Sequence, residues 1–319
     1  MAATRYRDAL EKGTLKQKAE QAAGLLEACR ICPRACGVNR LKGQTGFCRT
    51  GRDAVVCSAF AHQGEEPALS GSRGSGTIFF THCNMRCVYC QNYLFSQEGE
   101  GRCVTVRELA DTMLRLQKTG CHNINVVTPT HVMPQIVQAL YLAAQEGLEI
   151  PLVYNTSGYE KAEILHWLDG IVDIYLPDMR YAEEQPAIAY SSAPGYPRHN
   201  QESVLEMFRQ HPTAAFDKDG VMTRGLVVRH LVLPDGLAGT QQIFPFIAQR
   251  LSPKVFISLM SQYFPAYEAN GFPAIARRVS LQEYEAAVAL LEQHGLVNGW
   301  VQESHGLQRF AGTHIKRNI

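Results

Sequence analysis

The chain has 319 residues, of which 45% are hydrophobic and 19% charged, and its formal net charge is +1. A chain of this length and composition can bury one large globular core, alone or with a small appendage. The near-neutral charge argues against nucleic acid or an anionic membrane surface as an obligatory partner, and no apolar run reaches the length of a transmembrane helix.

The N-terminal residues lack the apolar core of a signal peptide, so we expect a cytoplasmic protein. Ten cysteines are present, and all of them lie before residue 122. In a large chain without a signal peptide, such cysteines indicate metal binding rather than disulfide bonds. The cysteine chemistry is therefore confined to the front of the chain.

Residues 6–28 are predicted to form a helix, because apolar residues recur at roughly helical spacing, although Gly13 interrupts the pattern. A loop-rich run with cysteine spacing C-x2-C-x3-C-x11-C follows. Four thiolates within twenty residues fit one tetrahedral zinc or one iron–sulfur cluster, with zinc slightly favoured, and four free structural thiols are the alternative. The proposed ligands of this second metal are Cys29, Cys32, Cys36 and Cys48; Cys57, Cys103 and Cys121 are expected to be small buried residues, although Cys57 could replace one ligand.

A second group of cysteines follows the predicted strand 76–81 in a tight loop with the spacing C-x3-C-x2-C: Cys83, Cys87 and Cys90. Thiolates select zinc, copper(I) or iron–sulfur clusters. A four-iron cluster usually takes four cysteines, so three close ligands leave one iron free to bind a substrate or cofactor. A zinc site completed by His82, or a set of buried structural thiols, is the alternative, although a closed structural zinc site seldom lies at the mouth of a barrel strand.

From residue 76 onward, short apolar runs alternate with amphipathic segments. Such runs are typical of parallel strands covered on both faces, and repeated strand–helix units predict right-handed crossovers. We therefore expect an α/β fold, a partial (β/α)6-type TIM barrel with its chemistry at the carboxyl ends of the strands. The predicted strands are 76–81, 123–127, 152–155, 172–176, 225–233 and 255–260, with 300–302 as a last short strand, and the predicted helices are 106–119, 134–145, 161–168, 201–210, 241–249 and 281–294.

These elements divide the chain into three predicted parts. Residues 1–70 contain the N-terminal helix and the cysteine-rich metal-binding extension. Residues 71–305 form the barrel, and residues 306–319 form a basic C-terminal tail that we expect to be mobile.

The three-cysteine loop resembles the cluster loop of radical S-adenosylmethionine (radical SAM) enzymes, in which an aromatic residue precedes the last cysteine, as Tyr89 does here. From about Cys29 to Trp300, the chain is similar to proteins related to the pyruvate formate-lyase activating enzyme. The resemblance implies a [4Fe-4S] cluster on the three cysteines, with SAM bound to the open iron next to Tyr89. It also implies that the reduced cluster cleaves SAM to methionine and a 5′-deoxyadenosyl radical, which abstracts hydrogen from a substrate.

The substrate is not specified by the cysteine loop. The resemblance suggests a glycyl residue of a partner enzyme as one candidate, with a small molecule or a peptide as open alternatives, and a reductant such as flavodoxin or ferredoxin as a further partner. No catalytic triad or carboxylate pair stands out in the sequence, as expected where a cofactor carries the chemistry. The competing hypothesis is a non-enzymatic iron–sulfur or zinc protein that binds metal or transfers electrons, which would not form 5′-deoxyadenosine from SAM.

The residues after each predicted strand should face SAM. Asn155 and Ser157 follow the third strand in a run that resembles the Asp-Thr-Asn-Gly run of glycyl-radical activating enzymes, and both are candidate SAM contacts; a polar turn that caps a helix is the alternative. Arg229 lies on the fifth strand in a segment that resembles Arg-Tyr-Val-Val-Pro-Gly of the same enzymes. A buried arginine needs an anion, and the candidates are the SAM carboxylate and Asp178, which has a turn cap as its own alternative role.

Other strand ends give weaker signals. The run 128–131 after the second strand departs from the Gly-Gly-Glu run that contacts the methionine amine in many radical SAM enzymes. The string Gly64-Glu65-Glu66-Pro67 looks similar, but it precedes the cluster strand, so we interpret it as unrelated to that function. His230 is expected to be a core histidine, and Tyr263 is expected either to contact adenosine or simply to pack.

Overall fold

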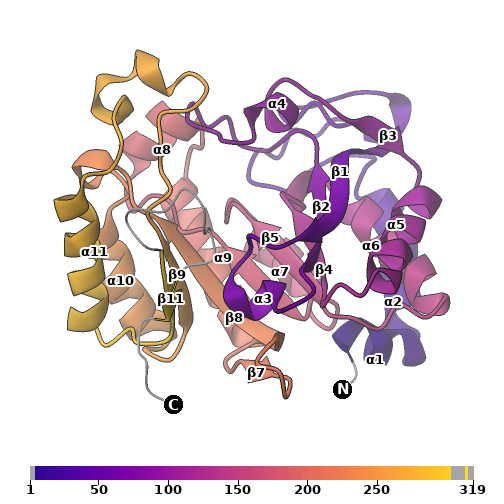
Figure 1. Cartoon of the computed structure of the whole chain (residues 1–319). Helices are drawn as coiled ribbons and strands as arrows, with labels where there is room; N and C mark the ends of the chain where they lie inside the picture. The colour runs from indigo at the N-terminus through magenta and orange to yellow at the C-terminus, as the bar shows by residue number, and fades with distance from the viewer. Residues whose placement is uncertain (1–3, 303–312, 315–319) are drawn as a thin grey trace.

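The structure is a computed structural model that describes residues 4–302 and 313–314. Within these residues, parallel strands form the centre of one sheet, in the spatial order β10-β9-β8-β6-β5-β4-β2. The sheet curves strongly without closing into a full barrel (Figure 1), which confirms an α/β fold with a mostly parallel sheet. The parallel strands are β2 (Ser75–Phe80), β4 (Ile124–Val127), β5 (Leu152–Thr156), β6 (Ile174–Pro177), β8 (Met222–Leu231), β9 (Phe256–Met260) and β10 (Gly299–Val301).

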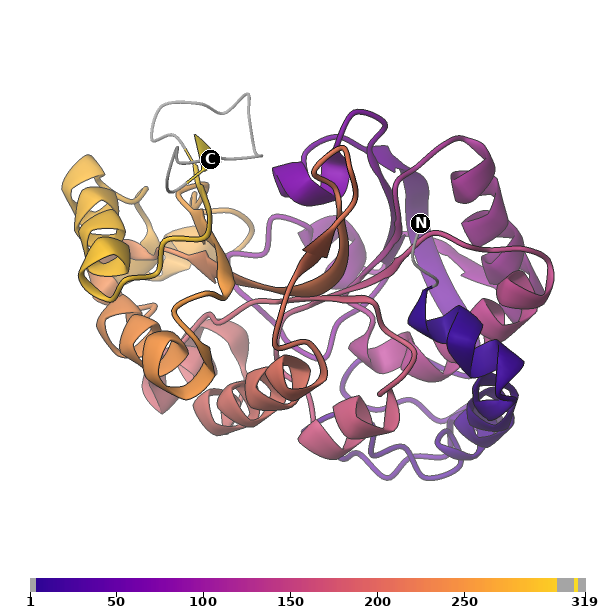
Figure 2. The same ribbon diagram turned by 90° about the horizontal axis from the view of Figure 1, so that it is seen from below.

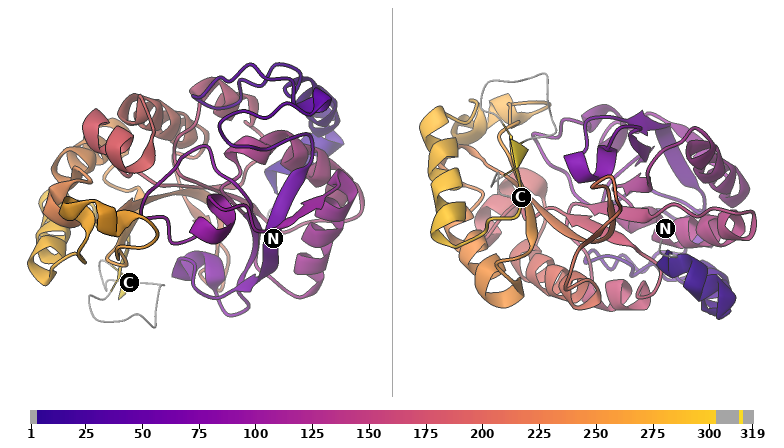
Figure 3. Two further views of the ribbon diagram at one scale, coloured as in Figure 1. Left: turned by 90° about the horizontal axis from the view of Figure 1, so that it is seen from above. Right: turned by 60° about the horizontal axis from the view of Figure 1, so that its bottom comes forward.

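Helices cover the outer face of the curved sheet (Figures 2 and 3). Each connection between consecutive parallel strands contains at least one helix, as a parallel sheet requires. All six predicted barrel strands and all six predicted barrel helices are present, with boundaries shifted by a few residues. The helices are α5 (Val106–Lys118), α6 (Met133–Gln145), α7 (Ala162–Trp167), α8 (Glu184–Ser191), α9 (Tyr196–Gln210), α10 (Thr240–Phe246) and α11 (Leu281–Gln293).

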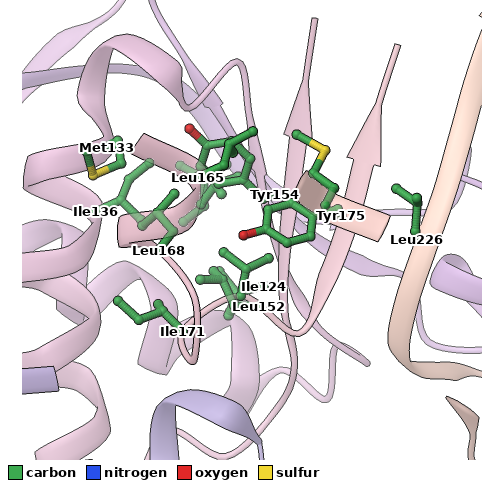
Figure 4. Packing of buried hydrophobic residues seen from close by; sticks show 14 of the residues in the cluster. Ile124, Met133, Ile136, Leu152, Tyr154, Leu165, Leu168, Ile171, Tyr175 and Leu226 are labelled. Atoms are coloured by element: carbon green, nitrogen blue, oxygen red, sulfur yellow. The ribbon is translucent and has the colours of Figure 1, made fainter. Parts of the chain in front are cut away.

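The main hydrophobic core lies between the sheet and these helices (Figure 4). Ile124 and Leu152 on neighbouring strands, Ile136 on α6, and Leu165 on α7 are each at most 2% exposed. Burial of one such side chain contributes about 1.5–3 kcal/mol. This layer fixes the positions of the strands, and with them the positions of the loops at their carboxyl ends.

The predicted helix over residues 6–28 is wrong in its extent. Two helices are present, α1 (Arg5–Glu11) and α2 (Thr14–Gly24), and Gly13 separates them with a left-handed backbone (φ 73°). Glycine adopts this conformation without the steric cost that a side chain brings. The helix pair packs on the outer layer, where the Tyr6 hydroxyl donates to the Ile150 carbonyl at 2.8 Å.

An antiparallel strand that was not predicted from the sequence extends the sheet. Strand β1 (Ala54–His62) pairs with β2 and also with β3 (Arg102–Val104). The short helix α3 (Pro67–Ser70) then enters the concave side of the sheet, where Leu69 packs with apolar residues of β5, β6 and β8. Residues 54–70 thus contact the barrel closely, and the boundary at residue 70 stays a prediction.

The predicted C-terminal strand is confirmed as β10. Most of the predicted tail, 306–319, lies outside the described residues, apart from β11 (Thr313–His314), which pairs antiparallel with β10. Within the part of the chain that the structure describes, every helix is too short or too polar to cross a lipid bilayer.

Candidate functional site

The three cysteines of the C-x3-C-x2-C motif lie in the loop that leaves the carboxyl end of β2. Each sulfur has a polar group within hydrogen-bond reach. The Met85 N–H donates to Cys83 Sγ at 3.3 Å, and a bond of 3.1 Å joins Cys90 Sγ to Ser96 Oγ. Cys87 Sγ accepts from Ser191 Oγ at 3.0 Å and from Arg180 Nη1 at 3.4 Å. Hydrogen bonds of this kind surround the thiolates of iron–sulfur clusters and tune their potential.

The loop offers three thiolates that could hold a metal cluster. Burial raises the pKa of the Cys83 and Cys90 thiols, so their anionic form needs a bound cation. Among the described residues, no three His, Cys, Asp or Glu side chains surround one point as a single metal ion requires. A four-iron cluster bonds each cysteine to a different iron, so these three residues fit a cluster with one open iron, and the zinc site with His82 stays the alternative.

A cavity of about 340 Å³ adjoins this loop. Its size falls in the range of small-molecule binding sites. Tyr89 and Cys90 line it from the cysteine loop, and Asn155, Asp178 and Arg229 line it from the ends of β5, β6 and β8. The structure therefore brings together residues that are far apart in the chain, at the carboxyl edge of the sheet where parallel α/β folds place ligands.

The charged centre of the cavity is a carboxylate held between two arginines. Asp178 accepts from Arg229 Nε at 2.8 Å and from Arg180 Nε at 2.9 Å. Burial would raise the pKa of Asp178, but Arg229 and Arg180 together hold it below its usual range. Because Arg180 also donates to Cys87 Sγ, this network connects the cysteine loop to the barrel strands. No role for Arg180 was predicted from the sequence.

The predicted SAM contacts differ in their placement. The ring of Tyr89 lines the cavity, and its hydroxyl is bound to the Tyr181 hydroxyl at 2.5 Å. Asn155 lines the cavity, whereas the Ser157 hydroxyl is buried and has no hydrogen-bond partner among the described residues. The Ser157 backbone carbonyl accepts from the Tyr196 hydroxyl at 2.8 Å. The cofactor roles of Tyr89, Asn155, Ser157 and Arg229 stay predictions.

The predictions for His230 and Tyr263 can be compared directly with the structure. His230 is a fully buried core histidine, as predicted, with its ring nitrogens 2.7 Å from the Met179 carbonyl and 2.9 Å from Thr240 Oγ1. Tyr263 packs against Tyr89 and donates to the Ile275 carbonyl at 2.6 Å. Its hydroxyl is therefore engaged within the protein.

The run Gly64-Glu65-Glu66-Pro67 lies closer to the site than its place in the sequence indicates, and its relation to the methionine amine stays a prediction. Gly64 and Glu65 line the same cavity as Cys90, because β1 runs antiparallel to β2 and brings the following loop inside the barrel. Burial and the neighbouring Glu66 raise the pKa of Glu65 to about 8. Two adjacent carboxylates before a short buried helix were the signal in the sequence that could have indicated a site here. The pairing of β1 with β2, which brings them to the cavity, cannot be predicted from the local sequence.

The run 128–131 after the second strand is not among the residues that line the cavity. Val127 lines the cavity, but Thr130 Oγ1 donates to the buried Glu160 carboxylate at 2.5 Å, and the His131 ring binds the Thr81 carbonyl at 2.8 Å. Burial raises the pKa of Glu160 to about 7. Thr130 and His131 are therefore engaged within the protein rather than in the cavity.

The four front cysteines come together around one pocket of about 10 Å³, lined also by His131. Gly46 is required for the close packing of this loop, because a Cβ there would lie 2.6 Å from Cys36 Sγ. The identity of any metal at this position stays a prediction. Of the remaining cysteines, Cys121 is buried as expected, but Cys103 is exposed and Cys57 is half-buried, so burial was wrongly predicted for both.

Gly158 is predicted to be intolerant of a side chain. Its backbone is left-handed (φ 72°), and a Cβ there would lie 2.2 Å from Asn200 Nδ2 and 2.3 Å from the Asp178 carbonyl oxygen. Gly170 has a similar backbone (φ 84°), but a Cβ at that residue would meet nothing within 4 Å. Gly158→Ala should therefore lower the free energy of unfolding by about 1–3 kcal/mol more than Gly170→Ala, as measured by chemical denaturation. Equal losses would contradict this steric account.

Comparisons with known proteins indicate a family for the chain. The sequence profile of the Radical SAM superfamily matches residues 77–213. The protein MJ0674 of Methanocaldococcus jannaschii, which is described as uncharacterized, is 30% identical over 292 residues, covering 88% of this chain and 79% of that protein. A HydG structure, described as a maturase of the FeFe-hydrogenase, covers 71% of this chain with a TM-score of 0.47 and 12% identity, and HydG from Carboxydothermus hydrogenoformans covers 70% with a TM-score of 0.48 and 11% identity. This chain spans about half the length of the two HydG chains, 50% and 52% respectively.

Proposed function

The chain belongs to the radical SAM superfamily, and on that premise we propose that Cys83, Cys87 and Cys90 hold a [4Fe-4S] cluster beside the cavity, which binds SAM. When bound, the cluster and SAM supply reductive cleavage of SAM and abstraction of a hydrogen atom from a substrate. The observation that supports this most directly is the position of the cysteine loop. Its last cysteine lines the same cavity as the strand-end residues of β5, β6 and β8.

The lining of the cavity suits a ligand that carries charges of both signs. SAM has a sulfonium, an ammonium and a carboxylate group. Arg229 and Arg180 supply cationic groups, and Asp178 and Glu65 supply carboxyl groups. Arg229 binds Asp178 only through Nε, and its two terminal nitrogens have no hydrogen-bond partner among the described residues. They are free to bind a carboxylate with two parallel hydrogen bonds.

The role of Arg229 gives a prediction that separates binding from stability. Arg229→Lys should retain the cluster yet weaken SAM binding by about 1–3 kcal/mol, or roughly 5- to 150-fold, because Lys cannot form the planar two-bond contact. Arg107→Lys is the matched control, since Arg107 pairs with Asp111 and Glu146 on the surface. SAM titration into the cluster-loaded protein and thermal melting would measure the two effects. Unchanged affinity with a lowered melting temperature would assign Arg229 a structural role only.

For the substrate, we propose a glycyl residue of a partner enzyme, with a flavodoxin or ferredoxin as electron donor. The similarity to proteins related to the pyruvate formate-lyase activating enzyme supports this choice over a small molecule. The test is to incubate the reduced, cluster-loaded protein with SAM and a cell extract and to search the protein fraction for a persistent organic radical by electron paramagnetic resonance (EPR). A radical that copurifies with a second protein supports the proposal, whereas a modified small molecule with no protein radical contradicts it.

A further inference from the structure

We infer that the pocket formed by Cys29, Cys32, Cys36, Cys48 and His131 is a second metal centre for a thiophilic metal, in which His131 supplies a nitrogen ligand, and that this centre holds the cysteine loop of the first site in position. The metal centre itself does not depend on the proposed function. Its positioning role does rest on the cluster proposed at Cys83, Cys87 and Cys90.

The size of the pocket limits its occupant. The space of about 10 Å³ is close to the minimum that one water molecule needs, so no organic ligand fits. Soft thiolates lining such a pocket select zinc or iron. The sulfurs do not yet surround one point as a single ion requires, so binding draws the thiol side chains inward around one ion or spreads them over the irons of a cluster.

His131 provides the observation that is independent of the cysteines. The ring is 1% exposed, and its Nε2 lies 2.8 Å from the Thr81 carbonyl. A carbonyl only accepts, so Nε2 carries the hydrogen and Nδ1 presents a lone pair. Nδ1 is buried and has no hydrogen-bond partner among the described residues. A histidine that donates one ring N–H to a backbone carbonyl and keeps the other nitrogen free is arranged as metal-binding histidines are.

The surroundings of the pocket favour anionic sulfur. The Phe47 N–H donates to Cys36 Sγ at 3.5 Å, and Arg40 Nη1 lies 3.9 Å from Cys29 Sγ. Arg34 also lines the pocket. Three or four thiolates around a divalent ion carry one or two excess negative charges, and these two arginines offset them. Isolated structural thiols would not need two cations beside them.

Three contacts connect this pocket to the cysteine loop of the first site. His131 binds the Thr81 carbonyl, Arg34 Nε donates to the Asn84 carbonyl at 3.0 Å, and Arg86 Nη2 donates to the Phe47 carbonyl at 3.3 Å. These contacts fall on both sides of Cys83. Metal bound at His131 would therefore fix the path of the chain between β2 and Cys87.

The first experiment measures metal in the full chain with Cys83, Cys87 and Cys90 replaced by Ala, so that the first site cannot contribute. Reconstitution with Zn²⁺ alone, or with Fe²⁺ and sulfide, should leave about one zinc ion or one iron–sulfur cluster per chain, and the two arms identify the metal. Adding Cys32→Ser or Cys48→Ser should abolish retention, whereas Cys103→Ser, at an exposed cysteine, should not. The inference would be overturned if both Cys32→Ser and Cys48→Ser still retained the metal. It would also be overturned if the triple-alanine chain retained neither zinc nor an iron–sulfur cluster.

A second measurement does not depend on the folding of a cysteine variant. Co²⁺ added to the intact triple-alanine chain should protect the four front thiols, but not Cys103, from alkylation as read by peptide mass spectrometry. His131→Ala should shift the visible Co²⁺ bands and weaken Co²⁺ binding at least tenfold. His211→Ala is the control, because His211 is equally buried at another position. Unchanged bands in His131→Ala would remove His131 from the ligands.

The positioning role has its own readout in the chain with all three loop cysteines intact. His131→Ala should retain the iron of the first cluster, but the EPR change that SAM causes in the reduced cluster should be lost or altered. A normal SAM-dependent change in His131→Ala would contradict the positioning role. If neither wild type nor variant responds to SAM, the proposed function fails while the metal analysis above still decides the second centre.

Discussion

Replacing Cys83, Cys87 and Cys90 together by Ala is expected to remove the iron of the first site and to abolish SAM cleavage completely. Each sulfur is placed in the loop after β2 and accepts or shares a hydrogen bond, and Cys90 is the one described cysteine that lines the cavity of about 340 Å³. Without these thiolates the loop has no cysteine ligands for iron. Iron and sulfide analysis together with assay of 5′-deoxyadenosine would measure both effects.

Single variants sharpen this test. Any one of the three Ala substitutions should already remove most of the iron, because three protein ligands are the minimum for a cluster with one open iron. Cys103→Ala and Cys121→Ala serve as controls, since one cysteine is exposed and the other is buried away from the cavity. SAM cleavage by the triple variant would show that the site has been misidentified.

Replacing Asp178 by Asn is expected to cause the largest loss of stability in the site. The carboxylate is 4% exposed and neutralises two arginines, Arg229 and Arg180. Removing one partner of a buried charge network leaves the other charges uncompensated, which costs about 3–5 kcal/mol. The free energy of unfolding from chemical denaturation would measure this loss.

The control for Asp178 is a carboxylate in an exposed pair. Asp111 pairs with Arg107 on the surface of α5 with 54% of its side chain exposed, so Asp111→Asn should cost at most about 1 kcal/mol. A loss in Asp178→Asn no larger than that in Asp111→Asn would show that the network contributes little to stability.

Acid pH should reveal the same network. The folded-state pKa of Asp178 is lowered, so its contribution is complete above the ordinary pKa of Asp, about 3.9, and is lost as the pH falls through the folded-state value. Between about pH 5 and about pH 2, the wild type should therefore lose more stability than Asp178→Asn. If the free energy of unfolding fell equally steeply with pH in both proteins, the lowered pKa of Asp178 would be contradicted.

The barrel was predictable because its signals are local. Parallel strands buried on both faces appear as short apolar runs, and β5 and β9 were located to within one residue. The cysteine loop was predictable for a similar reason, since its spacing alone restricts the chemistry. The long predicted helix was wrong because the turn at Gly13 outweighed the helical periodicity on both sides.

The parts that were missed depend on contacts between distant segments. Strand β1 is half-exposed and has no strong alternation, so only its pairing with β2 identifies it. That pairing carries Glu65 into the cavity, which no local pattern could indicate. The position of Arg180 between Asp178 and Cys87 and that of His131 beside the front cysteines likewise arise only when the barrel closes around them.

Formation of 5′-deoxyadenosine tests the central claim most directly. The protein should be loaded anaerobically with iron and sulfide, reduced with a low-potential electron donor, and incubated with SAM. The account predicts that 5′-deoxyadenosine and methionine accumulate, and that neither forms in the triple-alanine variant. A fully loaded and reduced protein that leaves SAM intact, with or without a cell extract, would contradict the radical SAM function and favour an electron-transfer or metal-binding role.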